Sequence, residues 1–324
     1  MTEKQSRNIQ LEKADRVEVT TIIDNYSEST LPMTEPPSEM IKRAPLAIEG
    51  RIPSDTLLAE HGLSLLVKVF KGNEEHSVLL DTGWSKTGVL HNMKRIGVDT
   101  SQIEAIVISH GHMDHFGALP ALLESMTSQA ISVIIHPDAF LQRALSLPTG
   151  VKIEFPLLEE ATLEKTSANV VKTKEPHRLA SGLVYSLGEI ERVTDFEKGM
   201  PAAVIKRDGE FRPDSILDDH GLAMCIKGKG LVIITGCAHS GVVNTVKYAQ
   251  KITGINDVYA IMGGFHLTGP EFKPLTDRTI EELTKINPAV VIPMHCNCWM
   301  ATNQIARELP DQFKLNSVGT TFCF

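Results

Sequence analysis

Long apolar runs and cysteines are both scarce in this sequence of 324 residues. No apolar run approaches the roughly 20 residues that cross a bilayer, and the N-terminal stretch MTEKQSRNIQLEKADRVEV lacks the apolar core of a secretory signal. There are only 5 cysteines, an odd and small number that argues against a disulfide framework and for reduced thiols. We therefore expect a cytoplasmic protein with no membrane partner.

Positive charge is also in short supply. The chain has 32 Lys and Arg against 40 Asp and Glu, and the resulting net charge of -8 repels nucleic acid over most of a surface. Hydrophobic residues make up 42% of the chain, which is enough for a substantial core. We expect a small-molecule substrate and no nucleic-acid partner, whereas the oligomeric state stays open.

Short β-branched runs alternate with helical stretches along the chain. The pattern predicts buried strands at 17–23, 63–69, 77–80, 105–108, 131–135, 231–235, 258–261 and 289–292. It predicts helices at 86–96, 118–126, 242–252, 277–286 and 301–309, of which the fourth is capped by Thr276 and ends at Asn287 and Pro288. This alternation is typical of a layered α/β fold, and we expect one domain over residues 1–324.

Two segments, near 31–60 and 186–220, resist a regular assignment. Prolines exclude a continuous helix or a central strand in the first one, at Pro32, Pro36, Pro37, Pro45 and Pro53. Glycines and prolines also interrupt the second segment. Long irregular connections are more often binding loops than scaffolding, so we expect both segments to be insertions within the domain.

Four histidines follow apolar strand-like runs. They are His110 in IVISHGH, His239 in VIITGCAH, His266 in AIMGGFH and His295 in VVIPMH. In α/β folds the carboxyl ends of the strands meet at one edge of the sheet, where ligands bind. The pattern therefore predicts that these histidines meet in space although they lie far apart in the sequence.

The stretch HGHMDH, residues 110–115, has the spacing of a metal-binding turn. His110 and His112 can lean to one side of an extended turn, whereas Asp114 and His115 lean towards a neighbouring point. Neutral imidazole and carboxylate groups suit zinc, iron and related metals. Each pair is short of a full coordination shell, so distant residues must complete both sites.

These residues resemble the HxHxDH signature of the metallo-β-lactamase superfamily without a departure. The segments LLDTG, GEIERVTDFE, DDHGLAM, TGCAHSGVVNTV, GGFHL and IPMHC extend the resemblance over nearly the whole chain. Together they resemble one subgroup, which contains the archaeal dihydropterin–aminobenzene ribofuranosyl phosphate synthase of methanopterin biosynthesis and many metal-dependent hydrolases.

The resemblance implies an αββα sandwich with a dinuclear metal site along one edge of two facing sheets. His110 and His112 would hold the first metal with His239. Asp114 and His115 would hold the second metal with His295. Two divalent ions are implied, zinc first, with manganese or iron as alternatives.

Other residues receive more than one interpretation. Cys237 is a bridging ligand or a small buried residue, His266 is a ligand or a hydrogen-bond donor to substrate, and His220 is a further candidate ligand. The resemblance gives Asp81 a role in orienting the metal-binding turn. The residues left, which line the pocket or are ordinary surface positions, are His61, Arg192 and Asn25. The CxC of Cys296 and Cys298 is a weak signal, which we set aside.

The function that follows is a dinuclear metal-dependent hydrolase acting on a small, possibly phosphorylated, substrate through a metal-bound hydroxide. Asp114 would orient the hydroxide, and His266 would protonate the leaving group. One alternative is a transferase like the methanopterin synthase. A second alternative is a sensor that binds a metal or a ligand without turnover.

Overall fold

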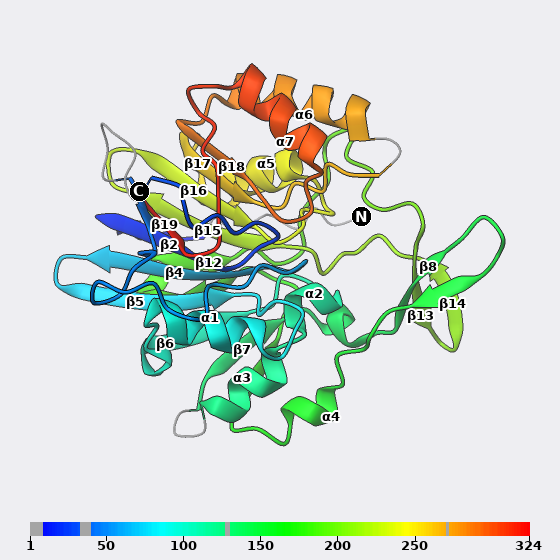
Figure 1. Ribbon diagram of the computed structural model, residues 1–324. Coiled ribbons are helices and arrows are strands. Elements are labelled where there is room, and N and C mark those ends of the chain that lie inside the picture. Colours follow the sequence, from blue (N-terminus) through cyan, green and yellow to red (C-terminus); the bar gives the residue numbers. More distant parts are fainter. Residues whose placement is uncertain (1–8, 33–39, 127–129, 270–271) are drawn as a thin grey trace.

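Two β-sheets face each other in the computed structural model, which describes residues 9–32, 40–126, 130–269 and 272–324 (Figure 1). Helices cover the outer face of each sheet, so the layers run helix, sheet, sheet, helix. This mixed α/β arrangement is the αββα sandwich that the resemblance implies.

The first sheet has eight strands within the described residues, in the order β10-β7-β6-β5-β4-β2-β19-β3. Strands β5, β6, β7 and β10 pair in parallel, and the strands on the other side of β5 pair antiparallel. The bounds are β2 Arg16–Ile23, β3 Ile41–Arg43, β4 Ser64–Lys71, β5 Glu74–Leu80, β6 Ile103–Val107, β7 Ser132–Ile135, β10 Asn169–Lys172 and β19 Thr320–Cys323.

The second sheet has seven strands among the residues that the structure describes. Six follow the order β11-β12-β15-β16-β17-β18, and β1 pairs with β15. Strands β16, β17 and β18 are parallel, so their carboxyl ends lie at the same edge. The bounds are β1 Lys13–Ala14, β11 His177–Leu179, β12 Val184–Ser186, β15 Gly221–Ile226, β16 Gly230–Thr235, β17 Val258–Gly263 and β18 Val290–Pro293.

Helices α5, α6 and α7 pack on the second sheet, and α1 and α3 pack on the first sheet (Figure 1). The helix bounds are α1 Gly88–Ile96, α2 Met113–Phe116, α3 Leu119–Ser125, α4 Glu160–Leu163, α5 Val242–Thr253, α6 Phe272–Ile286 and α7 Trp299–Glu308. In the described part of the chain no helix has the length and hydrophobicity that a membrane span requires.

Alternation along the strands explains the two-sided burial. In β6, Ala105 and Val107 belong to the core between the sheets, whereas Ile106 packs under the helices. In β16, Val232 lies between the sheets and Ile233 lies under α5. Successive strand residues point to opposite faces, so a strand with helices on one side and a sheet on the other must be apolar at nearly every position.

The predicted strands and helices all occur, with shifted ends. The C-terminal end of α6 is as predicted, because Asn287 adopts a positive φ of 53° after the last turn. The predicted cap Thr276 is wrong, since the helix already includes Phe272 and the Thr276 hydroxyl donates to the Phe272 carbonyl oxygen. A Thr inside a helix can satisfy its hydroxyl in this way without starting the helix.

The two irregular segments contain more regular structure than the sequence indicated. Within 186–220, β13 Ala203–Arg207 and β14 Glu210–Pro213 form a hairpin that joins β8 Arg143–Ser146 and β9 Lys152–Glu154 in a small separate sheet. In the 31–60 segment β3 forms an edge strand. Pro36 and Pro37 lie outside the described residues. The hairpin was missed because the glycines and prolines of this segment, such as Gly209 at the hairpin turn, are also typical of an irregular loop.

Candidate metal centre

The ends of four strands bring the predicted donor residues to one edge of the sandwich. The turn 109–115 follows β6, and Cys237 with His239 follows β16. His266 follows β17, and His295 follows β18. Parallel strands deliver their carboxyl ends together, and the structure places the side chains of both sheets in one buried cluster.

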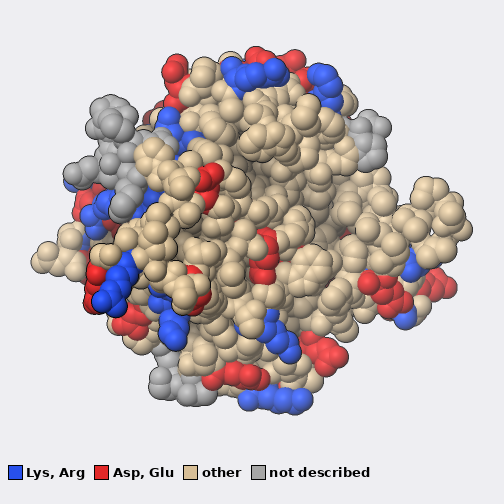
Figure 2. Space-filling view, in the orientation of Figure 1, with Lys and Arg blue, Asp and Glu red and all other residues tan. Residues whose placement is uncertain are grey.

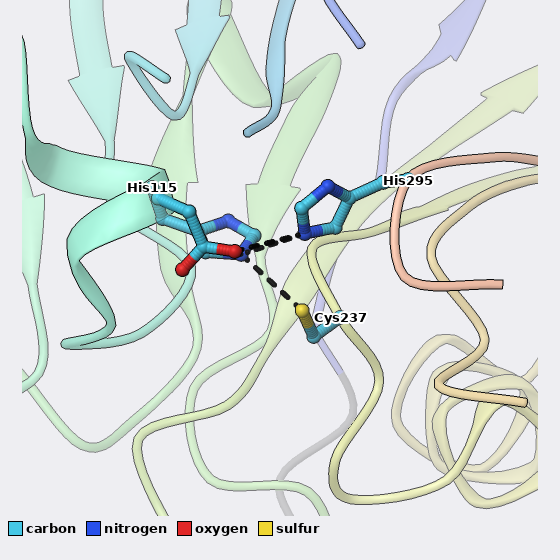
Figure 3. Close-up of side chains that lie close together, drawn as sticks. His115, Cys237 and His295 are labelled. Carbon is cyan, nitrogen blue, oxygen red and sulfur yellow. Dashed lines mark hydrogen bonds and ion pairs between the residues drawn. The ribbon is translucent and has the colours of Figure 1, made fainter. Parts of the chain in front are cut away.

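We call the first set of donors the Asp114 group: Asp114, His115 and His295, with Cys237. Their donor atoms all lie within 4.8 Å of one another. The His115 Nε2 atom is 3.2 Å from the Cys237 Sγ atom and 3.2 Å from the His295 Nε2 atom. Figure 3 shows the side chains of Cys237 and His295 turned towards His115.

We call the second set the His110 group: His110, His112 and His239, again with Cys237. The donor atoms of His110, Cys237 and His239 lie within 4.8 Å of one another. The His112 Nδ1 atom is 2.9 Å from the His110 Nε2 atom, and the His112 ring centroid is 4.9 Å from that of His239. Cys237 therefore belongs to both groups, and its thiol lies between them.

A third set contains Cys237, His266 and Cys296, whose donor atoms also lie within 4.8 Å of one another. The sequence analysis set Cys296 aside, and the structure adds that its side chain is buried against the carbonyl oxygen of Cys237. Cys298 belongs to none of the three sets among the described residues. The CxC spacing does not indicate the contact between Cys296 and Cys237, because that contact depends on how β16 and β18 are placed relative to each other.

Asp81, directly after the end of β5, contacts and supports the turn 109–115. Its Oδ1 atom accepts from the Ser109 backbone N–H at 2.7 Å, and its Oδ2 atom lies 2.6 Å from the His115 Nδ1 atom. A carboxylate only accepts, so His115 donates from Nδ1 to Asp81, and its Nε2 atom faces Cys237 and His295. This contact suits the orienting role that the resemblance implies for Asp81.

Arg143 and Asp218 form a second support that the sequence did not suggest. The Arg143 guanidinium, 2% exposed, contacts Asp214 at 2.8 Å and Asp218 at 2.5 Å. Asp218 in turn accepts from the Gly111 backbone N–H at 2.7 Å. Arg143 lies on β8 of the small sheet, 32 positions beyond Gly111 in the numbering, and no local pattern marks it.

The charges of the two groups differ. Burial and the Arg143 cation lower the pKa of His112 to about 3, and burial holds the pKa values of His110 and His239 well below their ordinary range. In the Asp114 group, burial is outweighed by neighbouring carboxylates, which raise the pKa of His115 to about 9. Neighbouring imidazoles likewise outweigh burial and hold the pKa of Asp114 low. The His110 group is thus neutral imidazole, whereas the Asp114 group contains an ionised carboxylate.

The residues of both groups fit a divalent metal. Both ring nitrogens of His239 and the Nε2 atom of His112 are buried without a hydrogen-bond partner in the described structure. Buried polar atoms are normally satisfied, so unpaired imidazole nitrogens that face other donors are expected where a cation is to be bound. Imidazole, thiol and carboxylate donors together suit zinc or iron.

The remaining predicted residues divide between the centre and its surroundings. The His61 ring stacks on His295 at 5.1 Å between centroids, and its Nε2 atom is 3.6 Å from the Asp114 Oδ2 atom. The Asn25 side-chain amide donates to the His295 backbone carbonyl oxygen at 2.6 Å and so supports the turn after β18. Arg192 donates to the Ser215 carbonyl oxygen, and His220 lies in none of the three donor sets among the described residues.

Comparison with known proteins agrees with this geometry. A model of the metallo-beta-lactamase superfamily matches residues 59–149. The chain is 32% identical over 272 residues to the 7,8-dihydropterin-6-methyl-4-(beta-D-ribofuranosyl)-aminobenzene-5'-phosphate synthase of Methanocaldococcus jannaschii, a match that covers 82% of this chain and 90% of that protein. It is 27% identical over 176 residues to the ribonuclease Z of Salinibacter ruber, over 52% of this chain and 49% of the relative.

A solved structure also resembles the whole molecule. It is described as a metal-dependent hydrolase of the beta-lactamase superfamily, with a TM-score of 0.72 and 22% identity. The similarity covers 94% of this chain and 98% of that one. At this identity the likeness shows the shared fold.

Proposed function

Because the chain belongs to the metallo-β-lactamase superfamily, in the subgroup that resembles the archaeal dihydropterin–aminobenzene ribofuranosyl phosphate synthase, we propose that it is a dinuclear metal-dependent hydrolase of a small phosphorylated molecule. The observation that carries the proposal is the position of Cys237 between two sets of donors. Two adjacent sets of donors with one donor in common fit a pair of neighbouring cations.

The proposed ligands follow from the two groups. His110, His112 and His239 hold one divalent ion, and Asp114, His115 and His295 hold the other. Cys237 is the shared donor, in the form of its thiolate. Zinc fits this donor set best, and iron is an alternative, because a thiolate favours softer metals than the oxygen-rich sites that manganese prefers.

Bound divalent ions would supply Lewis acidity, which polarises a phosphoryl oxygen and brings the pKa of water close to neutrality. The chain itself supplies orientation. The Asp114 Oδ2 atom lies 3.4 Å from His295 Nε2 and 3.6 Å from the Nε2 atom of His61, whose side chain is exposed. As an ionised carboxylate, Asp114 accepts a hydrogen bond from the attacking water and so fixes its direction.

His266 is placed to serve the leaving group. Its ring lies 4.2 Å from the His239 ring, and its Nδ1 atom has no partner within the described residues. The His266 side chain is half-buried and its ring contacts the His110 group through His239. An imidazole in this position donates a proton to the departing oxygen.

The proposed substrate is small and phosphorylated. The synthase relative is named after a compound that contains a phosphate group. On the face that contains α2, most Lys and Arg side chains lie towards the rim, and the central part is mostly uncharged apart from an acidic group near its middle (Figure 2). A mostly uncharged surface around the centre offers few ion pairs to a large charged ligand. It favours a compact ligand whose charged group is bound at the metal centre itself.

A second candidate is a transferase like the synthase, and it rests on the identity of 32% over 90% of that relative. In this case the acceptor is a second organic substrate rather than water. Both candidates use the same donors, so the structure of the centre is common to them.

The experiment that separates them uses the full chain loaded with zinc, manganese or iron. Phosphoesters, a lactone and a pterin precursor are tested alone, and the pterin precursor is then tested with an aminobenzene ribofuranosyl phosphate. We expect turnover of a phosphorylated compound that chelation abolishes and added metal restores. Asp114→Asn should abolish it, whereas His177→Gln, in β11 and outside the donor sets, should not.

The outcomes are distinct. A product that joins the two organic substrates, without hydrolysis of either one alone, replaces the hydrolase with the transferase. Tight retention of a ligand with no product favours a sensor. A chain that takes up no divalent metal contradicts the proposal in all its forms.

A further inference from the structure

Cys296 is a buried thiol that the proposed reaction does not use. It is 8% exposed and Cys237 is 3% exposed, and both are free cysteines. The Cys296 Sγ atom lies 3.4 Å from the Cys237 carbonyl oxygen. The two sulfur atoms and a His266 ring nitrogen lie within 4.8 Å of one another. Two thiols, one after the end of β16 and one after the end of β18, thus lie close together beside the donor groups.

Gly264 leaves the room that this contact needs. A Cβ atom at this position would lie 2.6 Å from the Cys296 Sγ atom and 3.1 Å from the Cys237 Cα atom. Any larger side chain would force the two cysteines apart, since real Cβ contacts are longer than 3.0 Å. Its backbone N–H donates to the Gly236 carbonyl oxygen, which holds the end of β17 against the Cys237 turn.

We propose that Cys237 and Cys296 form an oxidation-sensitive pair, which a peroxide converts to a disulfide when the centre holds no metal. One thiol is first oxidised to a sulfenic acid with release of one water, and the second thiol then displaces the hydroxyl as a second water. One sulfur–sulfur bond forms, and the two thiol hydrogens and two electrons reduce one peroxide to two waters. The two sulfur atoms, now within 4.8 Å of each other, must approach to the bond length of about 2 Å.

The consequence for the centre rests on the proposed function, because it requires Cys237 to be the donor shared by the two metal groups. A sulfur atom in a disulfide is no longer a thiolate and is a poor metal ligand. Oxidation would therefore remove the shared donor from both groups at once. Reduction by a dithiol would restore it, so that metal content follows the redox state of the pair.

Cys298 provides a matched control. It lies two positions from Cys296 at the start of α7, is half-buried, and belongs to none of the donor sets among the described residues. An unspecific reaction with peroxide would modify Cys298 at least as fast as Cys296, since it is more exposed.

The test treats the full chain with hydrogen peroxide, once after removal of metal by a chelator and once loaded with zinc. Peptides from a non-reducing digest are analysed by mass spectrometry. We expect a cross-link between Cys237 and Cys296 in the metal-free chain, lighter by two hydrogen atoms than the two separate peptides and lost on reduction. The zinc-loaded chain should resist, Cys298→Ser should behave as the unchanged chain, and Cys296→Ser should give no cross-link.

Zinc content after oxidation and removal of peroxide is the second measurement. The unchanged chain should rebind less zinc than its reduced form and recover on reduction, whereas Cys296→Ser should rebind equally in both conditions. A cross-link through Cys298, or oxidation of Cys237 to a sulfinic acid without a cross-link, overturns the pair. A cross-link that leaves zinc binding unchanged keeps the pair and instead contradicts Cys237 as the shared ligand.

Discussion

The two sides of the metal centre are supported in different ways. On the turn side, residues 109–115, Asp81 contacts the His115 ring and Asp218 accepts from the Gly111 backbone N–H, whereas the His112 Nε2 atom has no partner within the described chain. On the strand-end side, formed by Cys237, His239, His266 and His295, ring nitrogens of all three histidines lack partners within the described chain. Protein groups therefore hold most of the turn side, whereas more of the ring nitrogens on the strand-end side are left without a protein partner.

Two adjacent aspartates show the same contrast. Burial disfavours ionisation of both, but the Arg143 cation and the Gly111 N–H hold the pKa of Asp218 below its ordinary value. Asp219 accepts from the Ser240 backbone N–H on the strand-end side, and burial raises its pKa to about 6. Its Oδ1 atom has no partner among the described residues. A buried charge is well compensated only on the turn side.

Removal of metal should have the largest effect and should act unequally on the two sides. Chelation is expected to abolish activity, which added zinc restores. Hydrogen exchange measured with and without zinc should change more in 236–241 and 263–267 than in 109–115, because the turn side keeps its protein partners. Equal changes in hydrogen exchange on both sides would contradict the proposed difference in how the protein supports them.

Asp218→Asn should destabilise the metal-free chain by about 3 kcal/mol, because it leaves the buried Arg143 cation with one carboxylate instead of two. Urea unfolding at neutral pH measures the effect. Asp219→Asn is the neighbouring control, and it should not destabilise the chain. If both variants lose stability to the same extent, the different environments of the two aspartates do not affect the free energy of unfolding.

Asp81→Asn should weaken metal binding about 10–100-fold, because an amide can no longer fix the His115 tautomer as a carboxylate does. The loss should concern the Asp114 group and leave the His110 group loaded, so titration with zinc should show one weakened site. Asp24→Asn is the control on the strand-end side. Its side chain keeps an oxygen that accepts from the His295 backbone N–H, and a smaller change is expected.

The pH dependence of stability should differ between the unchanged chain and Asp219→Asn. A carboxyl whose folded pKa is raised contributes stability below its unfolded value of about 3.9, and this stability is lost as the pH rises through about 6. Asp219→Asn should therefore stabilise the metal-free chain by about 3 kcal/mol at pH 7 and by well under about 1 kcal/mol at pH 4. Thermal or urea unfolding at both pH values measures it. A gain of equal size at both would contradict the raised pKa.

Short-range patterns predicted the parts of the site that short-range geometry governs. HGHMDH holds four donors on one turn after β6, so their proximity follows from the spacing alone. His239, His266 and His295 were predicted to meet because they follow parallel strands, and the structure brings them together. Cys296 was missed, since its contact with Cys237 depends on Gly264 and on the spacing of three strand ends.

The support of the centre was the least predictable part. Arg143 lies on β8, a strand that the sequence did not predict. Its importance comes from Asp214 and Asp218, which follow the β13–β14 hairpin and contact Arg143 in the fold. A buried ion pair has no signature in the sequence, because each partner alone looks like a surface residue.

The order of the residues by itself determined the layered α/β class, the strands and the donor-rich turn, because these depend on periodicity and on neighbours within a few positions. Only the tertiary structure decided that Cys237 lies between the two donor groups, that Cys296 touches it, and that adjacent aspartates have opposite environments. Distances between strand ends are set by register, twist and the packing of two sheets, and these are properties of the folded whole.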